Sequence, residues 1–293
     1  MDEMMIRKKA LKIQERLGMR IGLSEGTSKY PVVKRFEEAF NALEVVYRVG
    51  LKAFVLPYSL FQNIKTSTDL YKSYYGDLIR LKDLAQKYNI ELAIHHPTLT
   101  DQPDEQLKLL STIAGIINAR IFVIHPSFYP RMPREQALKL VVYKLNEIAG
   151  SLGAYVKIGI ETTGKVDELG SLEDVIDIVK RTRRVEPVIN WAHIHARGVG
   201  ALRSEGDFKT IVSKATQQLG KPWLGNVYFF FSGISYGPSG EIKHIPLERS
   251  DIKLEYLIRA IMAFSIKGTL IFDDPEKEKF IIKILDSLAY MVR

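Results

Sequence analysis

Three histidines and a glutamate of this chain stand where apolar runs stop, and these residue types bind metal ions. The runs end in the segments 94–97 (IHHP), 123–126 (VIHP), 159–162 (GIET) and 190–193 (NWAH), which contain His95, His125, Glu161 and His193. The four side chains recur at intervals of 30, 36 and 32 residues, which is about the length of one strand–helix unit. Since successive parallel strands end at one mouth, the pattern predicts a metal site at the top of a βα barrel.

The ligand types available are restricted by the composition. The chain contains no cysteine, which excludes disulfides, thiolate ligands and cysteine nucleophiles. His95, His125 and Glu161 suffice to hold zinc, manganese or iron with one position left for water. One such histidine alone would more often be a strand-end residue bonded to a loop, but three ligand types on consecutive strands favour a metal site. His193 and His244 could together hold a second metal ion.

Short apolar runs alternate along the chain with segments of helical period. The runs predict buried parallel strands at 19–23, 53–57, 91–95, 120–125, 157–161, 187–191, 226–231 and 269–273. Helices are predicted at 32–49, 70–87, 105–118, 134–151, 172–183, 208–219, 252–266 and 276–291. Asp273 ends the eighth strand and faces the same mouth as the histidines; the alternative is an exposed turn aspartate before a proline.

This alternation predicts one (β/α)₈ TIM barrel domain of the α/β class over residues 1–293, with residues 1–17 as an N-terminal helical extension built on a basic amphipathic helix at 4–17. A doubly wound open sheet is the alternative. It usually needs fewer units and a glycine-rich first turn, and the segment 22–26 (GLSEG) is too irregular to be a dinucleotide fingerprint.

The bulk composition limits the cellular setting and the partners. No apolar stretch approaches 18 residues and no apolar signal core follows the N-terminus, so we expect a cytoplasmic protein without membrane contact. A net charge of +8 favours an anionic partner such as nucleic acid. A chain rich in Lys, Arg, Glu and Ile without Cys is also typical of thermophiles, whose surfaces are often basic, so both explanations of the charge stay open.

The strand-end motifs resemble those of the endonuclease IV family of metal-dependent abasic-site nucleases, within the xylose-isomerase-like barrel superfamily. The resemblance covers most of the chain beyond about residue 18. It rests on three strand-end motifs, which are His95 ahead of Pro97 and the segments 125–126 (HP) and 161–164 (ETTG), and on His193. The segments 232–234 (SGI) and 243–244 (KH) look like the seventh-strand loop of archaeal members, and the segment 273–275 (DDP) looks like the closing motif of the family.

The departures from that family concern metal ligands. Asn190 stands where the family has an aspartate, Phe230 where it has a histidine, and Ile242 where many members carry an aspartate. The resemblance implies a three-metal cluster, of which the His95, His125 and Glu161 set is intact. The second site keeps only Glu161 and Asp273, and the third keeps only His193 and His244. We therefore expect one or two divalent ions, zinc or alternatively manganese, rather than three.

The resemblance implies hydrolysis of the DNA backbone at abasic sites, with Glu161 and Asp273 as catalytic residues. Residues that follow strands belong to the catalytic rim, and we expect DNA contacts from Tyr58, Arg131, Lys165, Arg197, Arg203 and Lys243. The rim aromatics Phe61, Phe128, Tyr129 and Tyr236 could stack on bases or pack on the barrel itself, and the loop 57–68 could probe DNA. The basic segment 180–184 precedes a strand, so it belongs to the opposite end.

Two other functions fit the sequence. A sugar isomerase or epimerase of the same superfamily would take ligands from strands five to eight, where this chain has Glu161, Asn190, Phe230 and Asp273, so two of four are missing. A non-catalytic nucleic-acid-binding barrel would keep the basic rim and lose turnover.

Overall fold

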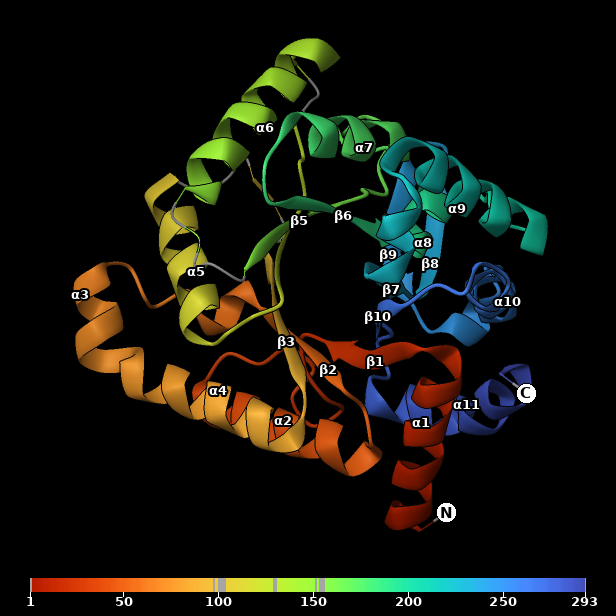
Figure 1. The fold of residues 1–293 in the computed structure, drawn as a ribbon, viewed down its shortest axis with the longest axis horizontal. Coiled ribbons are helices and arrows are strands. Elements are labelled where there is room, and N and C mark those ends of the chain that lie inside the picture. The colour runs from red at the N-terminus through yellow and green to blue at the C-terminus, as the bar shows by residue number, and fades with distance from the viewer. Residues whose placement is uncertain are drawn as a thin grey trace.

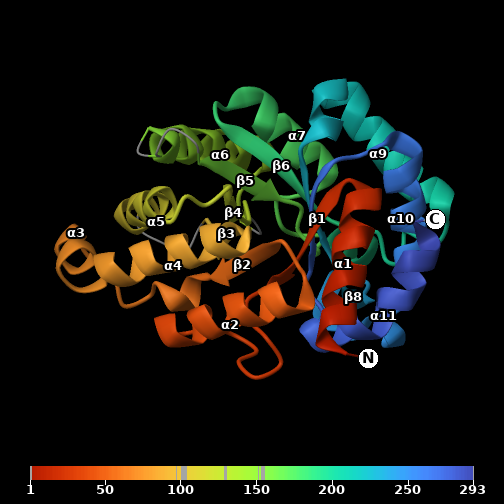
Figure 2. The same cartoon turned by 60° about the horizontal axis from the view of Figure 1, so that its bottom comes forward.

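Eight parallel strands close into a barrel surrounded by helices, in a computed structural model that describes residues 2–96, 98–99, 104–128, 131–150, 152 and 156–292 (Figures 1 and 2). The strand order around the barrel is β1-β10-β7-β6-β5-β4-β3-β2. The barrel strands are β1 (Met19–Ser24), β2 (Ala53–Pro57), β3 (Glu91–His96), β4 (Ile121–Ile124), β5 (Lys157–Glu161), β6 (Val185–Asn190), β7 (Val227–Phe231) and β10 (Gly268–Phe272). The predicted (β/α)₈ fold is confirmed.

The helices cover the outside of the barrel and connect its successive strands (Figure 1). They are α1 (Glu3–Leu17), α2 (Phe36–Val49), α3 (Ser67–Asp69), α4 (Tyr75–Tyr88), α5 (Asp104–Ile116), α6 (Arg134–Ala149), α7 (Leu172–Arg181), α8 (Trp191–Arg197), α9 (Glu205–Leu219), α10 (Leu254–Phe264) and α11 (Glu278–Met291). Short 3₁₀ turns lie at Tyr58–Leu60, Lys221–Gly225 and Leu247–Arg249, and a π turn at Leu70–Tyr74 precedes α4. Helix α1 packs against α2 and α11, so the N-terminal extension belongs to the outer ring.

The barrel interior is filled by side chains from alternate strand positions, as the period of a strand requires. These residues form one buried cluster: Ala53, Val55, Ala93, Ile121, Val123, Val188, Tyr228, Phe230 and Ile271. The bottom of the barrel is therefore packed, and the strand ends above this layer are free to carry polar groups. The pairings His95↔Val123, Ile124↔Ile160 and Asn190↔Phe230 bring the functional ends of neighbouring strands close together.

Two segments differ from the sequence-based prediction. Strand β6 ends at Asn190 and Trp191 begins α8, because the Asn190 side chain accepts a hydrogen bond from the His193 backbone N–H at 3.2 Å and caps the helix. The region after β7, for which no helix or strand was predicted, forms an antiparallel hairpin of β8 (Gly233–Gly237) and β9 (Gly240–Ile245).

Within the described ranges, none of the helices is both long and apolar enough to cross a membrane.

Candidate metal centre

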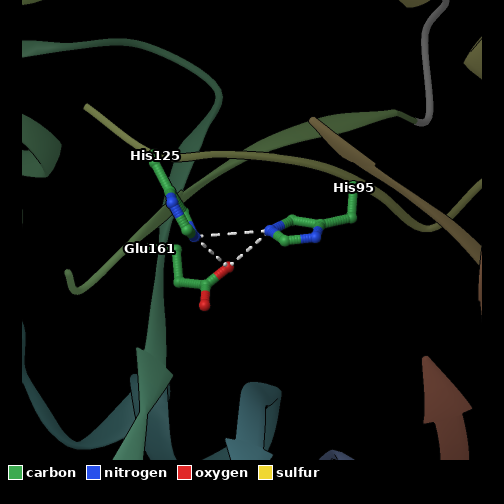
Figure 3. Close-up of side chains that lie close together, drawn as sticks. All are labelled: His95, His125 and Glu161. Carbon is green, nitrogen blue, oxygen red and sulfur yellow. Dashed lines mark hydrogen bonds and ion pairs between the residues drawn. The ribbon is translucent and has the colours of Figure 1, made fainter. Parts of the chain in front are cut away.

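Three predicted ligands meet at the top of neighbouring strands β3, β4 and β5. His95 lies near the end of β3, His125 directly follows β4, and Glu161 is the last residue of β5. Glu161 Oε2 lies 3.1 Å from His95 Nε2 and 3.3 Å from His125 Nε2, and the two imidazole nitrogens lie 3.4 Å apart (Figure 3). The three ligand atoms therefore form a nearly equilateral triangle, which we call the first triad.

The first triad has the dimensions of a zinc site. Tetrahedral ligands roughly 2.0–2.1 Å from zinc lie about 3.3–3.4 Å from one another, close to the three separations seen here. Glu161 is 1% exposed, and its Oε2 faces the imidazole nitrogens of His95 and His125. A buried carboxylate normally has a cation as its partner. The residues present thus fit a divalent metal ion.

The electrostatics of the first triad also favour a cation. Burial by itself would raise the pKa of Glu161, but the charges of His125 and His95 and hydrogen bonds from both outweigh it and hold that pKa well below its ordinary value. Burial would lower the pKa of His95, yet the charge of Glu161 and a hydrogen bond to it raise that pKa overall. Binding of a metal ion to these atoms would displace protons from them, because a histidine ligand must be neutral.

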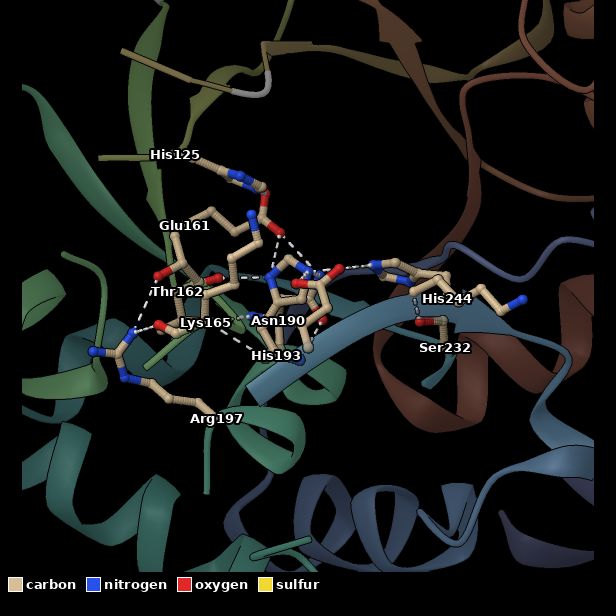
Figure 4. A network of polar contacts seen from close by, with 12 residues as sticks. His125, Glu161, Thr162, Lys165, Asn190, His193, Arg197, Ser232 and His244 are labelled. Atoms are coloured by element: carbon tan, nitrogen blue, oxygen red, sulfur yellow. Dashed lines mark hydrogen bonds and ion pairs between the residues drawn. The ribbon is translucent and has the colours of Figure 1, made fainter. Parts of the chain in front are cut away.

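A second group of ligand atoms lies beside the first. His193 Nε2 lies 3.2 Å from His244 Nε2 and 3.4 Å from Glu241 Oε2, and His244 Nε2 lies 3.5 Å from Glu241 Oε1. We call this group the second triad; its histidines come from α8 and β9 (Figure 4). The predicted pairing of His193 with His244 is seen in the structure, joined by a carboxylate that we did not predict.

Both histidines of the second triad are fixed through their other ring nitrogen. His193 Nδ1 lies 2.7 Å from the carbonyl oxygen of Thr162, to which it donates, and His244 Nδ1 lies 2.6 Å from Ser232 Oγ (Figure 4). Such contacts set the tautomer and leave Nε2 free to bind a metal. Burial lowers the pKa of His193, against the opposing effects of Glu241 and Glu161, so its ring tends to be neutral, as a ligand must be.

Glu241 reaches the second triad because β9 contains a bulge. The register runs Ser235↔Lys243 and then Tyr236↔Glu241, so Ile242 is an extra residue in β9. The bulge shifts the alternation of side chains by one, so Glu241 and His244 can face the same site although they are three positions apart in the sequence. Ile242 occupies the position where we noted a missing aspartate, and it points to solvent.

A glycine allows Glu241 to approach the end of β5. A Cβ at Gly164 would lie 2.6 Å from Glu241 Cβ, so a larger residue there would displace the carboxylate. The Glu241 backbone N–H also donates to the Gly164 carbonyl at 2.9 Å. The segment 161–164 thus supplies a ligand at its start and room for another at its end.

Two of the three departures from the family pattern, Asn190 and Phe230, contact residues of the first triad. Asn190 Nδ2 donates to Glu161 Oε1 at 2.9 Å, so the amide satisfies the second oxygen of the shared carboxylate. Phe230 is buried, and its ring centroid lies 5.7 Å from that of His95. His195, two residues beyond His193 in α8, contacts Asp251 Oδ1 at 2.9 Å and accepts from the Leu202 N–H.

Asp273 and two unpredicted residues line the same cleft of about 400 Å³ as both triads. Asp273 Oδ2 lies 3.7 Å from His244 Nδ1, the nitrogen turned away from the second triad, so this carboxylate lies outside both triads. Glu25 follows β1, and its pKa is raised by burial and by Asp273. Lys277 is a buried lysine, 5% exposed. Glu25 could have been found from its position after the first strand.

The predicted DNA contacts fall into two groups. The Arg197 guanidinium donates to Thr163 and to backbone carbonyls of the β5 loop, and Lys165 lies 3.2 Å from Glu168. The Arg203 guanidinium donates to the Gly200 carbonyl and also contacts Tyr236 and Asp251. These three side chains hold the rim together.

The other predicted DNA contacts differ in how far they are exposed to solvent. Arg131 and Lys243 are exposed to solvent at the same end of the barrel. Tyr58 follows β2 and packs partly against the core. Tyr129 and Pro97 lie outside the described residues, as does the side chain of His96.

The basic segment 180–184 lies before β6, at the end of the barrel away from the triads. Its Arg184 donates to the carbonyls of Leu152 and Val156, and Arg181 pairs with Asp177. These contacts give the segment a role in holding the chain together at that end.

Comparison with known proteins agrees with this architecture. A family model described as "Xylose isomerase-like TIM barrel" matches residues 36–289. An uncharacterized protein of Methanocaldococcus jannaschii is 26% identical over 258 residues, 86% of this chain and 92% of that protein. The structure of SacUVDE superposes with a TM-score of 0.68 at 14% identity, over 93% of this chain and 99% of its own. D-psicose 3-epimerase with D-tagatose from Clostridium cellulolyticum H10 gives 0.60 at 13% identity, over 94% and 96%.

Proposed function

Since the chain belongs to the xylose isomerase-like TIM barrel family, and the active sites of TIM barrels lie at the mouth where both triads are found, we propose that it is a metal-dependent phosphodiesterase that cleaves the DNA backbone at abasic sites. The observation that carries the proposal is the first triad, whose three ligand atoms lie 3.1–3.4 Å apart. The choice of DNA as substrate is supported by the likeness of the strand-end motifs to endonuclease IV and by the basic charge of the chain.

The two triads would hold one divalent ion each, and zinc suits their imidazole and carboxylate ligands. Such ions lower the pKa of coordinated water and neutralise charge on phosphoryl oxygens. The residues of the chain hold and orient these ligands. Glu161 Oε2 belongs to the first triad, and its Oε1 lies 3.4 Å from His193 Nδ1, the ring nitrogen turned away from the second triad. Asn190 keeps this carboxylate in place.

The ligand positions favour a nuclease over a sugar isomerase. The first triad uses His95 and His125 from the third and fourth strands, whereas the isomerase quartet would need Asn190 and Phe230 as ligands. Phe230 has no ligand atom, and the Asn190 amide N–H groups point to Glu161 rather than to a metal. A sugar site of that kind therefore lacks half of its ligands.

The proposal is tested by metal content and by cleavage. Protein purified without chelator is expected to carry about two zinc ions per chain by mass spectrometry, and His125→Ala is expected to lose one of them. The wild type should nick a duplex that contains one abasic site, and His125→Ala should reduce the rate by at least about 100-fold, because the cation of the first triad is lost.

Arg184→Lys, at the opposite end of the barrel, is a control for general damage and should keep both metal ions. If the wild type carries two metal ions and binds abasic DNA without cleaving it, the proposed phosphodiesterase activity is contradicted. The protein would then be a non-catalytic DNA-binding protein. Protein that takes up no zinc or manganese would contradict the metal site itself.

A further inference from the structure

Lys277 is a buried cation in the cleft that holds both triads. Its side chain is 7% exposed and lines the cleft with His95, His244 and Asp273. Its Nζ donates to the Ser24 carbonyl at 3.0 Å and lies 3.9 Å from Asp273 Oδ1, which is beyond hydrogen-bond distance. An ammonium has three N–H groups, and among the described residues only one of them has an acceptor.

The backbone at Lys277 adopts an unfavourable conformation. Lys277 has φ 55° and ψ −130°, a conformation that residues other than glycine rarely adopt. It is held there from both sides, because its N–H donates to the Asp274 carbonyl at 2.9 Å and its carbonyl accepts from the Phe280 N–H. Asp274 is itself fixed by N–H groups of Leu247 and Glu276. Such a strained conformation is common at functional sites, where the surrounding structure enforces it.

The ammonium lies near the two carboxylates of the cleft that belong to neither triad, Asp273 and Glu25. The pKa of Glu25 is raised by burial and by Asp273, while Lys277 opposes the rise. The cleft therefore contains a buried positive charge that is separate from both triads.

We propose that Lys277 binds a phosphate oxygen of the substrate through its remaining N–H groups, as a fixed cation beside the two triads. Among the described residues, no carboxylate lies within hydrogen-bond distance of the unused N–H groups of Lys277, and an ammonium binds phosphate as a point charge. A cleft of about 400 Å³ leaves room for such a group. The inference rests on the proposed function, since it deepens the same site.

The test measures binding of inorganic phosphate by calorimetry, on zinc-loaded protein freed of excess metal. Lys277→Met is expected to weaken phosphate binding at least about tenfold, which is the loss of one charge-assisted hydrogen bond, while the metal content stays at the wild-type value. Lys277→Arg should keep most of the affinity because it keeps the charge. Lys221→Met, an exposed lysine before β7, is the matched control and should bind as the wild type does.

A second measurement needs no variant and covers the case in which Lys277→Met does not fold. Phosphate should protect Lys277 of the wild type from reductive methylation, read by peptide mass spectrometry, and should leave Lys221 unprotected. Equal phosphate affinity in Lys277→Met and wild type, or no protection of Lys277, would overturn the inference.

Cleavage of abasic DNA is measured in parallel. Phosphate binding that depends on Lys277 in a protein that cleaves no DNA would refute the phosphodiesterase and keep the phosphate site. If the protein cleaves abasic DNA but its phosphate affinity does not depend on Lys277, the phosphate site is refuted and the phosphodiesterase activity is retained.

Discussion

The His244 imidazole is oriented by one hydroxyl, and this makes the second triad sensitive to a small change. Ser232→Ala removes the group that lies 2.6 Å from His244 Nδ1, so neither the tautomer nor the ring orientation stays fixed. Loss of such an outer partner weakens metal binding by roughly 10–100-fold. We therefore expect the variant to lose its second zinc ion to a competing chelator at correspondingly lower chelator concentration, while the first ion is retained.

Ser235→Ala is the matched control for this prediction, since Ser235 lies on the same hairpin and its hydroxyl donates to the Lys243 carbonyl. A Ser232→Ala protein that holds both ions as tightly as the control would show that the hydroxyl does not orient His244.

At the level of single residues, the sequence predicted the proximity of those candidate ligands whose positions follow from strand ends. His95, His125 and Glu161 come together because parallel strands end at one mouth. Glu241 could not be predicted in this way, because its orientation depends on the bulge at Ile242. Lys277 was missed for a related reason, since nothing in its sequence neighbourhood shows that the side chain is buried. The roles of Asp273 and of the rim residues as catalytic or DNA-binding groups stay predictions.

The β8–β9 hairpin is the element that completes the second triad, and Gly240 holds it to the end of β5. Gly240 has φ +91°, pairs with Lys165, and lies so close to Gly164 that an added Cβ would collide with the Gly164 carbonyl oxygen. Gly240→Ala should therefore shift the hairpin and lower the free energy of unfolding by about 1–3 kcal/mol. We also expect metal content to fall from about two ions per chain to one, because Glu241 follows the shifted residue.

Gly237→Ala, in the same turn, tests whether the effect is specific. Its added Cβ would make only ordinary contact, 3.6 Å from Ile242 Cδ1. Thermal unfolding and metal analysis of the two variants decide the matter: equal behaviour of both would mean that the close approach at Gly240 does not position the hairpin.

Elements with a buried periodic pattern could be predicted from the sequence, and those set by local geometry could not. All eight barrel strands were predicted within about two residues, because a parallel strand covered on both faces is apolar throughout. Hairpin β8–β9 was missed because its outer positions are polar and its register contains a bulge. Helix α8 was missed because its start depends on the Asn190 cap, a contact that overrides the apolar run through Trp191.

At the scale of the whole molecule, the chain has a net charge of +8, and its basic residues include the segment 180–184 at the end away from the triads as well as the rim residues at the end that holds them. Of the predicted DNA contacts at that end, Lys165, Arg197 and Arg203 are engaged by the rim, whereas Arg131 and Lys243 are exposed. If the basic rim binds DNA, the affinity should therefore depend on these two exposed charges more than on the total charge.

The last prediction follows from this distribution. Neutralising Arg131 and Lys243 together, as Arg131→Gln and Lys243→Gln, should reduce the slope of log affinity against log salt concentration by roughly 1–2, since each phosphate contact contributes about 0.7–0.9. The measurement is fluorescence anisotropy of a labelled abasic duplex between about 50 and 200 mM salt. The control pair is Lys180→Gln with Lys221→Gln, which removes the same charge from exposed positions before β6 and β7. Net charge acting at a distance would lower the slope equally in both pairs, and that result would exclude the rim as the DNA-binding surface.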